Sequence, residues 1–245
     1  MRDQAIVYLP LNVPKKAAEN VWIIDSGPIR PLGMRLPIRM TAIRLADGGV
    51  LVHSPTEFDA DLKRELEAIG PISHFVAPNS AHWTYLKAWQ EHVPDAVTWA
   101  APGLRRRRQV RRSGVRLDRV LKPHAPDWPQ EIVSVIVPGV GGFTEVALFH
   151  TPSRTLVLVD LVQNLEPAKL PPVLRYPARL AGVTAPVGRA PIYLRAIVKA
   201  KGNEAKVAAR RLASFEPEQV IFSHGAWFKH DGAARLRRSL AWLLR

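Results

Sequence analysis

The sequence predicts an α/β (α+β) fold, a four-layer αββα sandwich of two mixed β-sheets with helices outside. Short apolar runs typical of buried strands recur in both halves of the chain, and helical patterns follow them in each half. The 245 residues, 47% of them hydrophobic and 23% charged, are enough to build one sizeable core. We therefore expect a single domain over residues 1–245.

The first half of the chain opens with hairpin signals. Residues 21–25 (VWIID) form a short apolar run, and residues 38–45 (IRMTAIRL) mix apolar with polar side chains as a half-exposed strand does. The Asp-Gly-Gly sequence at 47–49 is typical of a hairpin turn, and residues 50–53 return as the partner strand. These segments predict one end of the first sheet.

A strong helix signal follows directly. Ser54 reads as the N-cap, Pro55 as the first helical residue and Glu57 as the partner that completes a capping box. Gly70 and the proline after it end the predicted helix. Its apolar side chains recur at helical spacing and are Phe58, Leu62, Leu66 and Ile69.

Strands and helices then alternate to the end of the chain. The further predicted strands are 73–77, 96–100, 131–137, 144–150, 155–159 and 219–223. The further predicted helices are 81–90, 192–215 with a break at Gly202, and 231–245. Residues 165–191 are rich in proline and arginine, and we expect them to form an irregular excursion over the surface.

The chain is strongly basic, with a formal net charge of +14 and a pI near 10.7. An arginine run at Arg105–Arg112 contributes to this charge. Such a balance is compatible with an anionic small-molecule substrate, an anionic membrane surface or a nucleic acid as partner, but it is explained most simply by a solvated surface in which arginine is used often. Aromatic residues that could stack on bases do not alternate with the arginines, which argues against nucleic acid without excluding it.

Composition also restricts the compartment and the metal chemistry. No apolar segment approaches the ~20 residues that span a bilayer, and the N-terminal segment lacks the apolar core of a secretory signal. We therefore expect a cytoplasmic protein with no membrane span. The chain has no cysteine, so disulfides and thiolate ligands are excluded. Any metal must be held by His, Asp, Glu or Asn.

Three predicted strands end in residues that can bind a metal. His82 follows the strand at 73–77, Asp160 ends the strand at 155–159, and His224 ends the strand at 219–223. Strand ends converge at one edge of a layered fold, and two imidazoles with one carboxylate suffice for a divalent ion. The alternative is a structural cluster without metal, in which Asp160 pairs with His224 or accepts backbone hydrogen bonds.

The order of these motifs resembles the metallo-β-lactamase fold, and more closely the DUF4336 family. The resemblance extends over most of the chain. It is carried by Arg39-Met40-Thr41, LVHSP (51–55), VAPNSAH (76–82), FHTPSRTL (149–156), VDLVQN (159–164) and FSHGAWF (222–228).

The departures from the superfamily pattern fall on its first metal site. The superfamily has an H-x-H-x-D-H run, and its ligand positions, aligned on the last histidine, are here Ala77, Asn79, Ala81 and His82. The next expected ligand histidine falls in the Gly139–Gly142 turn, which contains none. The resemblance therefore implies a degenerate site with at most one ion.

The remaining positions match the second metal site. Asp160 matches the usual bridging aspartate, and His224 matches the last ligand histidine. With His82 they form a set that implies one zinc, iron or manganese ion, or an empty site. Asn79 could orient a substrate, and His53, which replaces an aspartate of the superfamily, could hydrogen-bond a ligand from behind.

Two kinds of function stay open. The first is a hydrolase-like protein with at most one divalent metal, acting on an ester, lactone, amide or phosphoester. The second is a non-catalytic relative that has lost the metal and binds a partner or a small anion. Nucleic-acid binding or processing is a weaker third, supported by the Arg105–Arg112 run alone. The sequence indicates neither the substrate nor the oligomeric state.

Overall fold

The computed structural model describes residues 6–30, 35–122 and 128–245. Its larger sheet has seven strands, whose order in the sheet is also their order in the chain. These are β1 (Lys15–Ala18), β2 (Val21–Ile29), β3 (Leu36–Arg44), β4 (Val50–His53), β5 (Ile72–Ala77), β6 (Val97–Ala100) and β7 (Arg119–Val120). The pairing is antiparallel from β1 to β4 and parallel from β4 to β7, so the sheet is mixed.

The smaller sheet contains β8 (Ile132–Pro138), β9 (Thr144–His150), β10 (Thr155–Val157) and β12 (Gln219–Ile221). Its order is β12-β10-β9-β8, with β10 and β12 parallel and the other pairs antiparallel. A separate parallel pair joins β11 (Gln163–Asn164) to β13 (His224–Gly225). This short pair ties the segment after β10 to the segment after β12.

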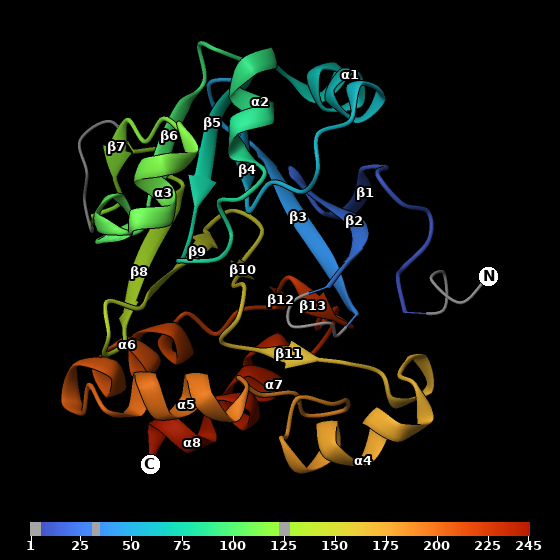
Figure 1. Cartoon of the computed structure of the whole chain (residues 1–245), viewed down its shortest axis with the longest axis vertical. Coiled ribbons are helices and arrows are strands. Elements are labelled where there is room, and N and C mark those ends of the chain that lie inside the picture. The colour runs from blue at the N-terminus through green and yellow to red at the C-terminus, as the bar shows by residue number, and fades with distance from the viewer. Residues whose placement is uncertain (1–5, 31–34, 123–127) are drawn as a thin grey trace.

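The helices form two groups, one beside each sheet (Figure 1). Those of the first half are α1 (Ala60–Ile69), α2 (Leu86–His92) and α3 (Arg108–Ser113), with the 3-10 turn η2 (Leu104–Arg106). Those of the second half are η3 (Pro167–Lys169), α4 (Pro172–Leu180), α5 (Ile192–Lys199), α6 (Asn203–Ser214), α7 (Gly232–Ser239) and α8 (Ala241–Leu244). Among the described helices, none has the length and apolarity needed to cross a membrane.

Side-chain alternation along the strands divides the core into three layers. Leu51 of β4 and Leu148 of β9 lie in the core between the sheets. Their neighbours Val52 and Phe149 point the opposite way, into cores closed by α1–α3 and by α5–α8 respectively. Helices, sheet, sheet and helices therefore follow one another (Figure 1), and the predicted four-layer αββα sandwich of two mixed sheets is confirmed.

The helix predicted to start at Ser54 begins only at Ala60, so the predicted capping box was wrong. The N-cap is Asp59, whose carboxylate accepts hydrogen bonds from the backbone N–H groups of Asp61 and Leu62. Ser54 is buried and has a φ of 55°, outside the geometry of a cap. The pattern misled because an Asp cap closer to the helical run competes with the Ser-x-x-Glu signal.

Replacing Asp59 with alanine is therefore expected to lower the free energy of unfolding by about 1 kcal/mol, the usual value of an N-cap. Glu57→Ala, which removes the glutamate of the capping box expected from the sequence, should change it by less than ~0.5 kcal/mol because Glu57 is exposed. Urea unfolding of both variants measures the difference. A larger loss from Glu57→Ala than from Asp59→Ala would contradict this cap assignment.

Three other segments differ from prediction in extent. Residues 81–85 form turns, so α2 is shorter than the expected helix. The excursion at 165–191 is not irregular throughout, since it contains the nine-residue α4. The helix expected at 231–245 divides at Leu240 into α7 and α8. The predicted break at Gly202 is confirmed, because Gly202 precedes α6 with a φ of 61°.

Candidate metal centre

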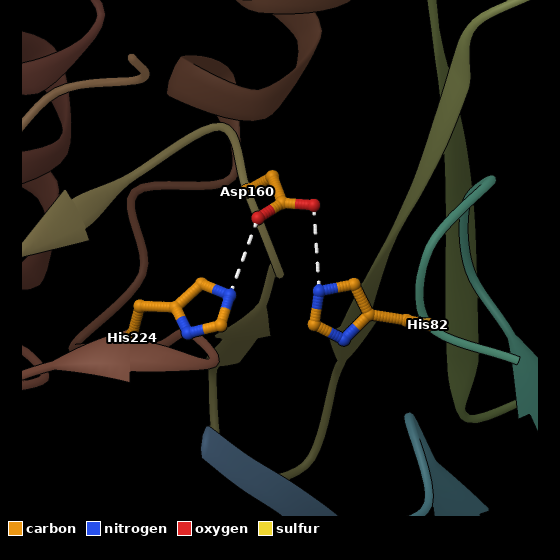
Figure 2. Close-up of side chains that lie close together, drawn as sticks. All are labelled: His82, Asp160 and His224. Atoms are coloured by element: carbon orange, nitrogen blue, oxygen red, sulfur yellow. Dashed lines mark ion pairs between the residues drawn. The ribbon is translucent and has the colours of Figure 1, made fainter. Parts of the chain in front are cut away.

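Three side chains from distant parts of the chain meet where strands of both sheets end (Figure 2). His82 lies in the turn after β5, Asp160 lies between β10 and β11, and His224 opens β13. Each offers one ligand atom, and these atoms all lie within 4.8 Å of one another. Among the described residues, this is the one group of three His, Cys, Asp or Glu side chains that meets such a criterion.

Figure 2 shows the Asp160 carboxylate between the two imidazole rings. The Nε2 atom of His82 lies 3.3 Å from Oδ2 of Asp160, and the Nε2 atom of His224 lies 3.4 Å from Oδ1. Burial alone would raise the pKa of the Asp160 carboxyl, but the two imidazoles hold it well below its usual value. Asp160 is therefore a carboxylate at neutral pH.

The outer nitrogens of both rings are held by the chain. Nδ1 of His224 donates to the carbonyl oxygen of Pro37 at 2.7 Å, and a carbonyl can only accept. In the neutral ring, Nε2 of His224 therefore carries the lone pair. Nδ1 of His82 lies 2.7 Å from the Ser54 hydroxyl. A hydrogen bond at the outer nitrogen is the usual way in which a protein orients a ligating histidine.

Asn79 links His82 to Asp160 and is fully buried. Its Oδ1 accepts from the backbone N–H groups of Ala81 and His82 at 2.8 and 3.0 Å. Its Nδ2 therefore faces Asp160 and donates to Oδ2 at 2.7 Å. Both ends of the amide are engaged within the chain, so Asn79 joins the turn of His82 to Asp160, and its role in orienting a substrate stays a prediction.

Glu145 supports the loop that carries Asp160, a role that the sequence did not indicate. Its fully buried carboxylate accepts hydrogen bonds from the backbone N–H groups of Val159, Asp160 and Leu161 at 2.9 to 3.3 Å. Burial and the charge of Asp160 raise the pKa of Glu145, whereas the backbone N–H donors on both of its oxygens lower that pKa and favour the carboxylate. Glu145 thus fixes the backbone on both sides of Asp160 through hydrogen bonds.

Arg39 supports the loop that carries His224 and was also not assigned a role from the sequence. Its Nη1 donates to the carbonyl oxygens of Phe222 and Gly225 at 2.9 and 2.8 Å. Its Nη2 lies 2.6 Å from Oδ1 of Asp25. Both side chains of this ion pair are only 2–3% exposed. The pair therefore joins β2 and β3 to the segment on either side of His224.

His53, expected behind a ligand, makes no hydrogen bond to either candidate ligand histidine. Its Nε2 is buried without a hydrogen-bond partner among the described residues. The neighbouring Ser54 takes the expected position at His82. Burial and, to a smaller extent, the nearby His82 lower the pKa of His53 to about 3, against the opposing effect of a backbone hydrogen bond at Val146. His53 is therefore a neutral core histidine at pH 7.

This burial predicts a loss of stability in mild acid. The folded chain protonates His53 only near pH 3, whereas the unfolded chain does so near 6.5. Stability is therefore lost as the pH falls below 6.5, by up to ~1.4 kcal/mol per pH unit from this group. Urea unfolding between pH 7.5 and 4.5 should show a shallower pH dependence in His53→Gln than in wild type or in His92→Gln, whose histidine is exposed. Equal slopes in all three would contradict the prediction.

A family model described as a domain of unknown function, DUF4336, matches residues 18–182, more than half of the chain. The chain belongs to the DUF4336 family. His82 and Asp160 lie within the matched segment, and His224 lies beyond it. No curated protein matches this DUF4336 chain.

Solved structures similar to this DUF4336 protein include several metallo-β-lactamases. The enzyme from Pontibacter korlensis aligns with a TM-score of 0.63 at 14% identity, over 94% of this chain and 97% of that chain. The enzyme from Erythrobacter litoralis gives 0.65 at 12% identity, over 97% and 98%. The metallo-β-lactamase FIM-1 from Pseudomonas aeruginosa, in its mono-zinc form, gives 0.61 at 15% identity, over 94% of each chain. At such identities the likeness shows the fold, and the expected metallo-β-lactamase-like architecture is confirmed.

Proposed function

We propose that this protein is a hydrolase-like enzyme that uses a single divalent ion held by His82, Asp160 and His224. The observation that carries the proposal is the meeting of three ligand atoms within 4.8 Å. Ala77 and Ala81 stand where the superfamily has further ligands, which supports one ion instead of two. A single ion also has a parallel in the mono-zinc form described for FIM-1.

The chemistry of the donor set fits a metal. In its neutral form His224 points the lone pair of Nε2 at Oδ1 of Asp160 from 3.4 Å, and two such electron-rich atoms repel unless a cation or a proton lies between them. Nitrogen and carboxylate donors suit zinc, iron and manganese. The orienting contacts at Nδ1 of both rings support the same conclusion, because they aim both Nε2 atoms at one point.

A divalent ion at this position would supply Lewis acidity, which acidifies water and polarises a carbonyl or phosphoryl group. The chain itself would hold the three candidate ligands in position. Asn79 hydrogen-bonds Asp160 from the turn that carries His82, and Glu145 accepts from the backbone N–H of Asp160. Arg39 donates to the backbone beside His224. The proposed substrates are esters, lactones, amides or phosphoesters, and the net charge of +14 supports an anionic one.

A hollow of about 220 Å³ is lined partly by residues close in sequence to those of the candidate centre, and we propose that it receives part of the substrate. Its walls include Ile38, Glu57 and Tyr85. In the sequence, Ile38 follows Pro37, which binds His224, Glu57 is three residues after Ser54, which contacts His82, and Tyr85 is three residues after His82. Asn12 and Ser26 add polar atoms to the wall. We place the non-reacting part of the substrate here, because a mixed polar and apolar lining suits orientation more than chemistry.

Metal content is the decisive test. Protein purified without chelator or affinity-tag metal, then incubated with zinc, iron or manganese and desalted, should retain about one ion per chain by mass spectrometry. The triple variant His82→Ala, Asp160→Ala, His224→Ala should retain none. His230→Ala serves as the matched control, since its histidine is exposed and should leave the metal content unchanged.

The outcomes separate the two functions. One retained ion that depends on the three residues justifies a screen of ester, lactone and phosphoester substrates with the loaded protein. If wild type retains no more metal than the triple variant, the hydrolase proposal has lost its mechanism. The cluster would then be a structural His–Asp–His group in a non-catalytic relative.

A further inference from the structure

Helix α4 presents an apolar face to solvent, the reverse of an ordinary surface helix. Val173, Tyr176 and Leu180 are 80%, 69% and 66% exposed and recur at positions i, i+3 and i+7. None of the residues of α4 is buried. The first turn of α5 adds Ile192 and Tyr193, which are 58% and 66% exposed. We call these five side chains the α4–α5 face.

The α4–α5 face belongs to a fixed part of the fold. Ala178, on the opposite side of α4, packs on a small core around Leu170 and Val183. The guanidinium of Arg195 in α5 donates to the carbonyl oxygen of Ala181 at 2.8 Å, which ties the end of α4 to α5. Figure 1 shows α4 at the margin of the molecule, beyond β11 and apart from the two main sheets. The exposed apolar side chains are therefore held outward by packing on their inner side.

Arginines flank the apolar stripe. Arg175 and Arg179 of α4 are exposed and follow the stripe along one side of the helix. The chain as a whole carries a net charge of +14. Apolar side chains bordered by arginines are typical of a helix that lies in the interface of an anionic bilayer. We propose that the α4–α5 face docks this protein on an anionic membrane surface.

Charge favours a bilayer over a second copy of the chain as the occupant. In a two-fold contact between identical faces with the two α4 helices antiparallel, the arginines of one copy lie beside those of the other. Like charges at an interface cost affinity, whereas anionic head groups neutralise Arg175 and Arg179 while the acyl region receives Val173, Tyr176 and Leu180. The bilayer therefore satisfies both parts of the surface, and a second copy satisfies only the apolar part.

One side chain of the α4–α5 face interacts electrostatically with the candidate metal centre. Partial burial raises the pKa of Tyr193, and the charge of Asp160 adds to the rise. Tyr193 is thus within electrostatic reach of Asp160. Membrane docking does not depend on metal binding, however, and the two can be tested separately.

Vesicle sedimentation tests the proposal with the full chain. Wild type should co-sediment with phosphatidylcholine vesicles that contain 30% phosphatidylglycerol, and about tenfold less with pure phosphatidylcholine. Val173→Ser with Tyr176→Ser and Leu180→Ser should weaken binding at least ~10-fold, through lost apolar contact. Arg175→Gln with Arg179→Gln should weaken it about 10- to 30-fold, at roughly fivefold per arginine near the surface. All these residues are exposed, so the variants should stay folded, which circular dichroism checks.

Two controls isolate the α4–α5 face. Arg111→Gln with Arg112→Gln on α3 removes the same charge elsewhere, and Val207→Ser removes an apolar side chain that is 54% exposed on α6. Both should bind vesicles within about twofold of wild type. The proposal is overturned if wild type binds neither vesicle or if the α4 and α3 arginine variants lose binding equally. Concentration-dependent dimerisation that the serine variant abolishes would assign the face to a second copy and also overturn it.

Discussion

Glu145→Gln is expected to lower the free energy of unfolding by about 2–3 kcal/mol and to weaken metal binding about 10- to 100-fold. The carboxylate accepts from Val159 and Leu161 through Oε1, and from Asp160 and Leu161 through Oε2. A glutamine keeps only one acceptor oxygen, so its NH₂ group must face buried backbone donors. The loop of Asp160 loses its support, and the candidate ligand shifts with it.

Two measurements separate the effect of Glu145→Gln on the placement of Asp160 from its effect on the stability of the whole fold. Urea unfolding gives the loss of stability, and the absorption spectrum of bound cobalt reports the ligand geometry under conditions where both proteins are folded. Glu65→Gln on α1 is the matched control, because it makes the same chemical change at an exposed position. An unchanged cobalt spectrum and affinity in Glu145→Gln would show that Glu145 has no part in placing Asp160.

The second large effect is expected at Arg39. Arg39→Met should cost about 3–5 kcal/mol, because it leaves Asp25 as a buried carboxylate that has lost one of the two cations seen at it among the described residues. The carbonyl oxygens of Phe222 and Gly225 also lose their donor. Within the part of the chain that the structure describes, Asp25 keeps Lys15, whose Nζ lies 2.5 Å from Oδ2.

A double-mutant cycle checks this account. In the double variant, Asp25→Asn removes the buried carboxylate charge that Arg39→Met would leave without its arginine. The double variant should therefore lose less stability than the sum of the two single variants. Urea unfolding of the four proteins gives the coupling energy, expected at more than ~1 kcal/mol. Additive losses would mean that the two side chains do not act as a pair.

The positions of the strands along the chain and the meeting of His82, Asp160 and His224 could be predicted because both rest on local signals. Apolar runs mark the strands, and His82, Asp160 and His224 each stand where such a run ends. The helical layers followed from periodicity alone. The fold was therefore accessible from the sequence. The resemblance to DUF4336 then indicated that the three strand ends carrying His82, Asp160 and His224 belong to one site.

The supports of the site could not be predicted, because each depends on distant contacts. Glu145 reads as the polar position of an alternating strand, and only the packed structure shows three backbone donors converging on it. Arg39 reaches carbonyl groups more than 180 positions away, at Phe222 and Gly225. Ser54 carries a local signal for a helix cap, and its contact with His82 arises only when β4 and β5 are paired.

The origin of the three candidate ligands has a kinetic consequence. His82 comes from the half of the chain that forms the seven-stranded sheet, whereas Asp160 and His224 come from the half that forms the four-stranded sheet. An ion held by all three is a cross-link that exists only after the two sheets have packed. It would therefore slow the unfolding rate in proportion to its affinity and leave the refolding rate nearly unchanged.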